Sequence, residues 1–397
     1  MDVAPRRRSS DLSETSTTST TSDDSTMSSD SSVAKSHTSH KKLRVIDLSW
    51  LMLTDIVGTG VLTLAKAAAD LGWVWVIVII TLMCPVAIYS AVMMVRARTL
   101  LVGAGRPPPK SMGHATSVLF NGNKCLVRCV YTIVYGYALL GNASYLLVIG
   151  TSLQGALFTV LSEICLPTAV AISCVVLLPL VVGMRWLEQS VWLCLINMII
   201  LLAAIATVVA GLVSEERSSS VSTHLFAPDL SVMAVFGATS NIVYAYTGHW
   251  MYFELMDELK HPHEFPKTFI LNGPVMVVVY VSVAAIGYYY FGDCAPGNFV
   301  DATTNVAFRT SVETMLFVHV CIVYMLKSIV LSHFFHSVAS PKRVEEKSSV
   351  AHAQYAGFAI AMLAFGFVFA NSIPFFNDML GCVGKTLAPS YPRWLPN

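Results

Sequence analysis

Seven long stretches without Asp, Glu, Lys or Arg constrain this sequence more than any other feature. A helix needs about 20 mainly apolar residues to cross the hydrocarbon core of a membrane, and the shortest of these stretches has 21. The stretches are residues 71–95, 129–162, 164–184, 189–214, 230–253, 268–292 and 348–377. Charged residues interrupt two further apolar segments, 45–69 and 312–338. The sequence therefore predicts an all-α polytopic membrane protein with about nine complete spans.

The composition narrows the class of protein further. Hydrophobic residues make up 55% of the chain and charged residues 12%, whereas soluble domains contain about 25% charged residues. The net charge is +1, and no run of basic residues is longer than Arg6-Arg7-Arg8, so we predict no nucleic-acid partner. We find no nucleophile–base pair, metal-ligand cluster or phosphate-binding loop, so we predict no enzyme, no cofactor and no metal site. A disulfide between Cys165 and Cys294, at predicted outer ends, is an alternative to free thiols.

The first 42 residues differ from the rest of the chain. Ser and Thr occupy 20 of the 32 positions from 9 to 40, and such a segment cannot bury enough apolar surface to fold. We predict a disordered tail over 1–42, with or without phosphorylation, and a membrane domain over 43–397. If the tail is cytoplasmic, 19 of the 25 Lys and Arg residues lie on the cytoplasmic side. This orientation is expected, because cytoplasmic loops are enriched in Lys and Arg.

The first apolar segment contains a predicted break. Gly58 and Gly60 lie within it, and each weakens a helix by about 1 kcal/mol relative to Ala. Non-helical backbone at membrane depth persists only where protein or a water-filled cavity surrounds it, and Asp55 also favours a cavity or a charged partner. The alternative is a continuous helix in which small residues permit close packing.

The sixth segment has the same character. Gly237, Asn241 and Gly248 interrupt its apolar run, and the polar tips of Tyr244 and His249 lie near its centre. Broken spans at corresponding places, first and sixth, predict an inverted repeat of five plus five helices with a binding site between them.

The third segment carries polar residues at helical spacing, at Tyr131, Tyr135, Asn142 and Tyr145. Residues at this spacing share one face of a helix. Because hydroxyl and amide groups in hydrocarbon need partners, this face either forms hydrogen bonds between helices or lines a cavity.

Several short motifs occur in a recognisable order. They are GTGVL, LGW twelve residues beyond Gly60, YAYTGHW running into FELMDELKHPHEFPK, Tyr280, GYYYFG, and the stretch from His319 to Tyr324. Residues 43–397 thereby resemble the amino acid/auxin permease family of the amino acid–polyamine–organocation superfamily. The resemblance implies a fold like that of the bacterial leucine transporter and secondary active transport of a free amino acid or a similar small zwitterion. We expect symport by alternating access, coupled to protons or to sodium.

The resemblance has two departures. Ala65 and Lys66 stand where the family usually has a proline and an aromatic residue. The segment Phe376–Asn397 resembles only the start of the tenth span, so we expect a fold truncated within helix 10. Oligomerisation would compensate for the missing helix. The alternatives to a transporter are a non-transporting amino acid sensor and an inactive family member.

The two breaks provide complementary partners for a zwitterion. Free backbone N–H groups and the helix dipole near Gly60 suit a carboxylate, and carbonyls near Tyr246 and Gly248 suit an ammonium. The predicted substrate-binding residues are Val57, Gly58, Thr59, Gly60, Tyr135, Tyr244, Tyr246, Thr247 and Gly248, and the predicted coupling or gating residues are Asp55, Lys327, Glu254 and Asp257.

The coupling ion is expected to be a proton. A fixed Lys327 ammonium can fill the position that a sodium ion would need, so Lys327 or Asp55 is the predicted titrating group. The alternatives are a purely structural ion pair between them and a lysine that extends toward the interface. The membrane is expected to be the plasma membrane or that of a vacuole or lysosome.

Overall fold

The computed structural model describes residues 42–372, apart from residues 121, 161–163, 215–220, 229, 304 and 345. All of these belong to one compact unit. The predicted tail, except for Lys42, and the predicted partial tenth span over Phe376–Asn397 both lie outside the described residues.

The described residues form helices and no β-strand; the only β-type pairing among them is an isolated bridge between Leu43 and Leu259. The first six α-helices are α1 (Val45–Ile56), α2 (Leu64–Leu71), α3 (Trp73–Gly103), α4 (Met112–Leu119), α5 (Lys124–Leu157) and α6 (Leu166–Gly183). The others are α7 (Val191–Ser214), α8 (Val232–Ala245), α9 (Tyr252–Glu258), α10 (Thr268–Phe291), α11 (Val306–Ala339) and α12 (Ser349–Ser372). Short 3₁₀ helices are η1 (Thr59–Thr63), η2 (Leu187–Ser190), η3 (His249–Met251), η4 (Pro262–Lys267), η5 (Gly292–Cys294) and η6 (Phe299–Ala302).

Seven of the helical segments in the described part of the chain are long and apolar enough to cross a membrane, and an eighth is the bent pair formed by α1 and η1–α2. Six of the seven charge-free stretches become single long segments, built on α3, α5, α6, α7, α10 and α12. The seventh stretch, residues 230–253, is divided among α8, η3 and the start of α9. The chain is therefore an integral, multi-pass membrane protein.

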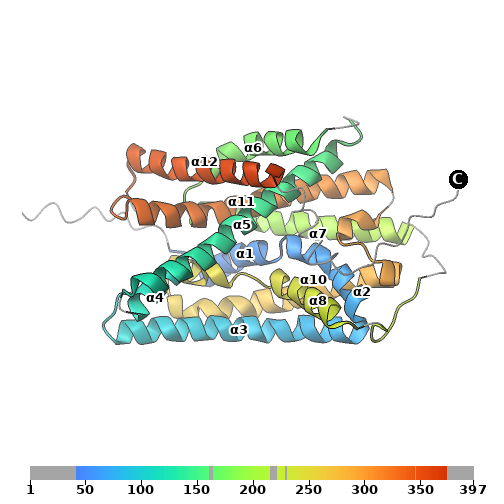
Figure 1. Cartoon of the computed structure of the whole chain (residues 1–397), viewed down its shortest axis with the longest axis horizontal. Helices are drawn as coiled ribbons and strands as arrows, with labels where there is room; N and C mark the ends of the chain where they lie inside the picture. Colours follow the sequence, from blue (N-terminus) through green and yellow to red (C-terminus); the bar gives the residue numbers. More distant parts are fainter. Residues whose placement is uncertain are drawn as a thin grey trace, which may run out of the picture. The chain divides into compact units, whose positions relative to one another are not determined.

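Helix α11 is the most enclosed of the long helices. It packs most extensively against α5 and α7 and also contacts α12; Figure 1 shows α5 running diagonally across the other helices. This enclosure explains why α11 can carry polar residues at membrane depth, because polar side chains inside a membrane protein face the bundle interior. Glu313, His319, Lys327 and Ser328 are all buried on it.

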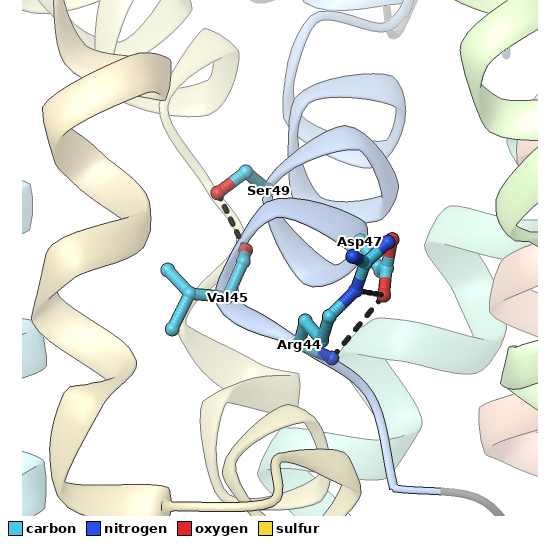
Figure 2. Close-up of polar contacts among 4 residues, drawn as sticks. All are labelled: Arg44, Val45, Asp47 and Ser49. Atoms are coloured by element: carbon cyan, nitrogen blue, oxygen red, sulfur yellow. Dashed lines mark hydrogen bonds and ion pairs between the residues drawn. The ribbon is translucent and has the colours of Figure 1, made fainter.

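Polar contacts fix the start of α1, as Figure 2 shows. The backbone N–H of Arg44 donates to Asp47 Oδ2 at 3.3 Å, and the Arg44 guanidinium forms an ion pair with the same carboxylate at 3.0 Å. An acidic residue in the first turn also interacts favourably with the helix dipole. Just before α1, the Leu43 N–H donates to the carbonyl of Glu258 at 2.8 Å. This last contact ties the first span to the end of α9.

The opposite end of the broken first span is held by residues 221–227. The turn between α2 and α3 is made by Gly72 at φ +80°, and a Cβ there would lie 2.8 Å from the backbone of Leu225 and Ala227. The N–H of Val74 donates to Leu225 O at 3.0 Å, and the N–H of Ala227 donates to Leu71 O at 3.3 Å. The loop before α8 therefore holds the end of α2.

Candidate functional site

The first span is interrupted between α1 and α2. Helix α1 ends at Ile56, and the chain resumes as the 3₁₀ helix η1 at Thr59 with a bend of 42°. Gly58 lies in the interruption, with φ −104° and ψ −145°. Low helix propensity at Gly58 and Gly60 accounts for the position of the break. The predicted break in the first span is therefore present in the structure.

The sixth apolar segment is also interrupted, and its break contacts the first one. Helix α8 ends at Ala245, residues 246–248 are not helical, and η3 begins at His249. A Cβ added at Gly60 would lie 2.7 Å from the Cα of Ala245. One added at Gly248 would lie 3.0 Å from Cγ1 of Ile56. Gly60 thus permits close approach of the two breaks.

One tyrosine on α10 connects the two breaks. The Tyr280 hydroxyl lies 2.6 Å from the carbonyl oxygen of Ala245 and 3.1 Å from that of Ile56, in donor geometry to each. A hydroxyl has one hydrogen, so it donates to one carbonyl at a time. The Ile56 carbonyl also accepts from the Gly58 N–H at 2.8 Å, so the Ala245 carbonyl, at the end of α8 where helical donors are missing, depends more on Tyr280.

Replacing Tyr280 by phenylalanine is expected to destabilise the protein by about 1–3 kcal/mol, because the buried carbonyl of Ala245 loses its donor. Tyr246→Phe is the matched control, because its hydroxyl donates only to Ile80 O, within the continuous helix α3, at 2.9 Å. The measurement is thermal unfolding of both variants in detergent. A Tyr280→Phe variant no less stable than Tyr246→Phe would contradict the bridging role.

A small pocket lies between the breaks and the helices that face them. Its lining comes from α1, η1, α5, the region around the break after α8, and α11: Asp55, Ile56, Gly60, Tyr137, Ala138, Gly141, Asn142, Tyr145, Tyr244, Thr247, Trp250 and Lys327. Its free volume of about 30 Å³ has room for one or two water molecules. The structure is therefore closed around this pocket.

A buried ion pair forms part of the pocket wall. Lys327 Nζ lies 2.7 Å from Asp55 Oδ1, and the two side chains are 9% and 2% exposed. The lysine nitrogen also lies 5.2 Å from the ring centroid of Tyr145 and 5.8 Å from that of Trp250. These are cation–π distances. The ion pair anticipated as an alternative is therefore formed, and it joins α1 to α11.

The predicted substrate residues divide into two groups. Gly60, Tyr244 and Thr247 line the pocket, as do the predicted coupling residues Asp55 and Lys327. The other predicted substrate residues are not among its lining: Val57, Gly58, Thr59, Tyr135, Tyr246 and Gly248. Gly58 packs against the Tyr145 hydroxyl, and the Tyr246 side chain is directed to α3 instead.

The polar face of the third segment both lines the pocket and forms a hydrogen bond between helices, the two alternatives predicted for it. Ala138, Asn142 and Tyr145 line the pocket, whereas the Tyr135 hydroxyl donates to Glu254 Oε1 at 2.9 Å. Sequence reasoning missed the lining residues Ile56, Tyr137, Gly141 and Trp250. Trp250 belongs to the YAYTGHW motif, and this was the only available signal for it.

A profile of the family described as transmembrane amino acid transporter protein matches residues 41–396. The chain belongs to this transporter family. A curated relative is the N amino acid transport system protein of Neurospora crassa, 23% identical over 174 residues. That match covers 42% of this chain and only 36% of the relative.

The family assignment agrees with the fold. A solved structure of a nucleobase-cation-symport-1 family transporter, in a closed conformation with bromovinylhydantoin bound, matches with a TM-score of 0.58. The match covers 86% of this chain and 75% of the other at 12% identity. This transporter-family chain therefore shares the fold of a transporter, which has a small molecule bound in the matched structure.

The remaining predicted gating residues of this transporter-family member, Glu254 and Asp257, lie on α9 and away from the pocket. Glu254 accepts from Tyr135, whose ring stacks on Phe334 with centroids 3.4 Å apart. Asp257 forms an ion pair with Arg98 near the end of α3 at 3.1 Å. Both acids therefore hold α9 against neighbouring helices.

A wider groove adjoins the pocket between α5 and α8. It is open, has a volume of about 360 Å³ and is lined by residues that include Phe236, Ser240 and Val243. The groove and the pocket share Tyr137, Tyr244 and Thr247. These three side chains form the boundary between the closed pocket and the open groove.

Proposed function

We propose that this chain is a secondary active transporter that carries free amino acids by alternating access, with protons as the coupling ion. The observation that carries the proposal is the pocket formed where the two interrupted spans meet, with Asp55 and Lys327 in its wall. Family membership and the fold shared with a transporter support it. The five-plus-five inverted repeat of the bacterial leucine transporter is the architecture we propose for it.

The substrate class follows from the chemistry of the two breaks. After Gly58 the chain begins a helical segment at Thr59, whose first N–H groups and positive dipole end suit a carboxylate. Residues 246–248 offer non-helical backbone beside the pocket for an ammonium. A free amino acid carries both groups and can therefore bridge the two interrupted spans.

The ion pair supports coupling to protons rather than to sodium. The Lys327 ammonium lies 2.7 Å from Asp55, where a sodium ion bound by that carboxylate would have to lie. A proton that reaches Asp55 removes the negative charge and releases Lys327 from the pair. The freed ammonium can then attract the carboxylate of an arriving substrate, so protonation and binding favour each other.

The closed pocket must open for transport. Its free volume of about 30 Å³ is too small for an amino acid, whereas the adjoining groove is open and about 360 Å³ in volume. We propose that movement of Tyr137, Tyr244 and Thr247 connects the groove to the pocket. The membrane is proposed to be the plasma membrane or that of a vacuole or lysosome, with the amino terminus in the cytoplasm.

Uptake of labelled amino acids into proteoliposomes tests the proposal. We expect accumulation that requires an inwardly directed proton gradient, proceeds without sodium and stops when a protonophore collapses the gradient. An unchanged rate from pH 5.5 to pH 8 in sodium-free buffer would contradict proton coupling. Saturable binding without flux would instead identify a sensor, and an inactive family member would show neither.

A further inference from the structure

Four of the cysteines in the described part of the chain are exposed: Cys125, Cys129, Cys165 and Cys294. All four are free thiols, so the disulfide considered between Cys165 and Cys294 is not formed. Cys125 and Cys129 differ from the other two because they lie four residues apart near the start of α5. Residues at this spacing are neighbours on one face of a helix.

The face that carries Cys125 and Cys129 continues as an apolar stripe. Ile133 is 70% exposed, and Leu140, two turns further along the same face of α5, is also exposed. Large exposed apolar side chains on a membrane-spanning helix are directed to lipid rather than to water. Both thiols therefore lie at the end of a lipid-facing stripe.

The depth of the two thiols follows from the length of α5. Crossing a core of about 30 Å takes about 26 residues even at a tilt of about 40°, and α5 has 34. About eight residues must therefore extend beyond the hydrocarbon. Lys124 and Arg128 identify the start of α5 as a polar end, and the preceding Leu119 and Phe120 are exposed apolar residues suited to an interface. Cys125 and Cys129 thus lie at headgroup level.

The charge pattern assigns a side of the membrane to these thiols. The connection between the second and third spans contains six Lys and Arg residues, from Arg96 to Arg128. Basic connections of this length remain on the cytoplasmic side. Cys165, at the other end of α5 and before α6, is then on the opposite side of the membrane.

We propose that Cys125 and Cys129 are S-acylated by long-chain fatty acyl groups. Each Sγ attacks the thioester carbonyl of an acyl-coenzyme A, forming a new thioester as the carbon–sulfur bond to coenzyme A breaks. The thiol proton passes to the departing coenzyme A sulfur, so no oxidant or reductant is consumed. The acyl chains lie along the stripe formed by Ile133 and Leu140 and anchor the start of α5 at the interface, as juxtamembrane acylation does.

The test is acyl exchange on the full chain expressed in eukaryotic cells. Thioesters are cleaved with neutral hydroxylamine after free thiols have been blocked, and the released thiols are counted with a maleimide of known mass. We expect two mass increments for the unmodified sequence, one for Cys125→Ser or Cys129→Ser, and none for the double variant. The matched control, Cys165→Ser with Cys294→Ser, changes equally exposed cysteines and should keep both increments.

Three results would overturn the proposal: no increments in the unmodified sequence, increments that persist in the double variant, or their loss from the control. The sidedness has its own measurement. With Cys382→Ser in every variant, a membrane-impermeant maleimide applied to intact cells displaying the protein at their surface should label Cys165 and Cys294 but not the Cys165→Ser, Cys294→Ser control. If Cys125 or Cys129 were labelled in that control after hydroxylamine treatment, they would lie on the extracellular side, which would contradict their assignment to the cytoplasmic side.

Discussion

Replacing Lys327 by methionine is expected to lower the free energy of unfolding by about 3–5 kcal/mol, because the buried carboxylate of Asp55 then lacks its ion-pair partner. The Asp55 side chain is only 2% exposed, so water cannot replace the ammonium without a rearrangement of the pocket. Methionine keeps the length and apolar character of the lysine stem. Unfolding in detergent, followed by heat or denaturant, measures the loss.

The companion variant Asp55→Asn should lose less stability than Lys327→Met. It leaves a buried ammonium, but the rings of Tyr145 and Trp250 stay within 6 Å of it and stabilise the cation in part. The double variant Asp55→Asn, Lys327→Met removes both charges and should recover most of the loss. The resulting cycle isolates the interaction energy of the pair.

Lys66→Met is the matched control. Lys66 and Asp70 also form an ion pair within the first span, but their side chains are 24% and 22% exposed. Partly exposed pairs contribute about 0–1 kcal/mol, so this variant should remain close to the unmodified protein. If Lys327→Met were no less stable than Lys66→Met, the buried pair would not have the structural importance assigned to it.

The same set of variants separates structure from coupling. If Asp55 and Lys327 couple substrate to protons, the double variant should regain stability but not proton-driven uptake. Uptake in the double variant that still responds to the proton gradient as in the unmodified protein would place the titrating group elsewhere.

The architecture was accessible from the sequence because its physical signals are local. A charge-free stretch of more than 20 residues has few alternatives to a membrane span, and glycines within an apolar helix identify the breaks. The ion pair was also accessible as an alternative, because a buried Asp55 and a buried Lys327 each require a partner.

The lining of the pocket was less accessible, because it depends on how helices are rotated against one another. Side-chain directions follow a regular period only within a continuous helix, and Tyr246 lies in the break after α8. The sequence therefore did not reveal that the Tyr246 hydroxyl donates to Ile80 O on α3. Tyr135 and Tyr145 share a face but lie about 15 Å apart along the helix. Only Tyr145 is level with the pocket.

The contact made by Tyr280 could not be derived from any local pattern. Its two acceptors, at Ile56 and Ala245, are 224 and 35 residues away in the sequence. The resemblance singled out Tyr280 as a motif residue, and only the assembled helices reveal the two carbonyls that it contacts.

Replacing Gly60 by alanine is expected to abolish transport and to destabilise the protein by about 1–3 kcal/mol, the usual cost of overpacking. The new Cβ would lie 2.7 Å from the Cα of Ala245. Because that neighbour is backbone, the two interrupted spans themselves must separate. Gly136→Ala on α5 is the matched control, because a Cβ there meets no atom within 4 Å and alanine favours the helix.

Gly58→Ala distinguishes separation of the spans from loss of backbone flexibility. Its Cβ would meet the Tyr145 hydroxyl at 3.1 Å, and a side-chain tip can move where backbone cannot. We therefore expect Gly58→Ala to retain part of the uptake that Gly60→Ala loses, with Gly136→Ala unaffected. Equal loss in both variants would show that flexibility at the break matters more than the contact with Ala245. Full uptake by Gly60→Ala would show that close contact between the two breaks is not required for transport.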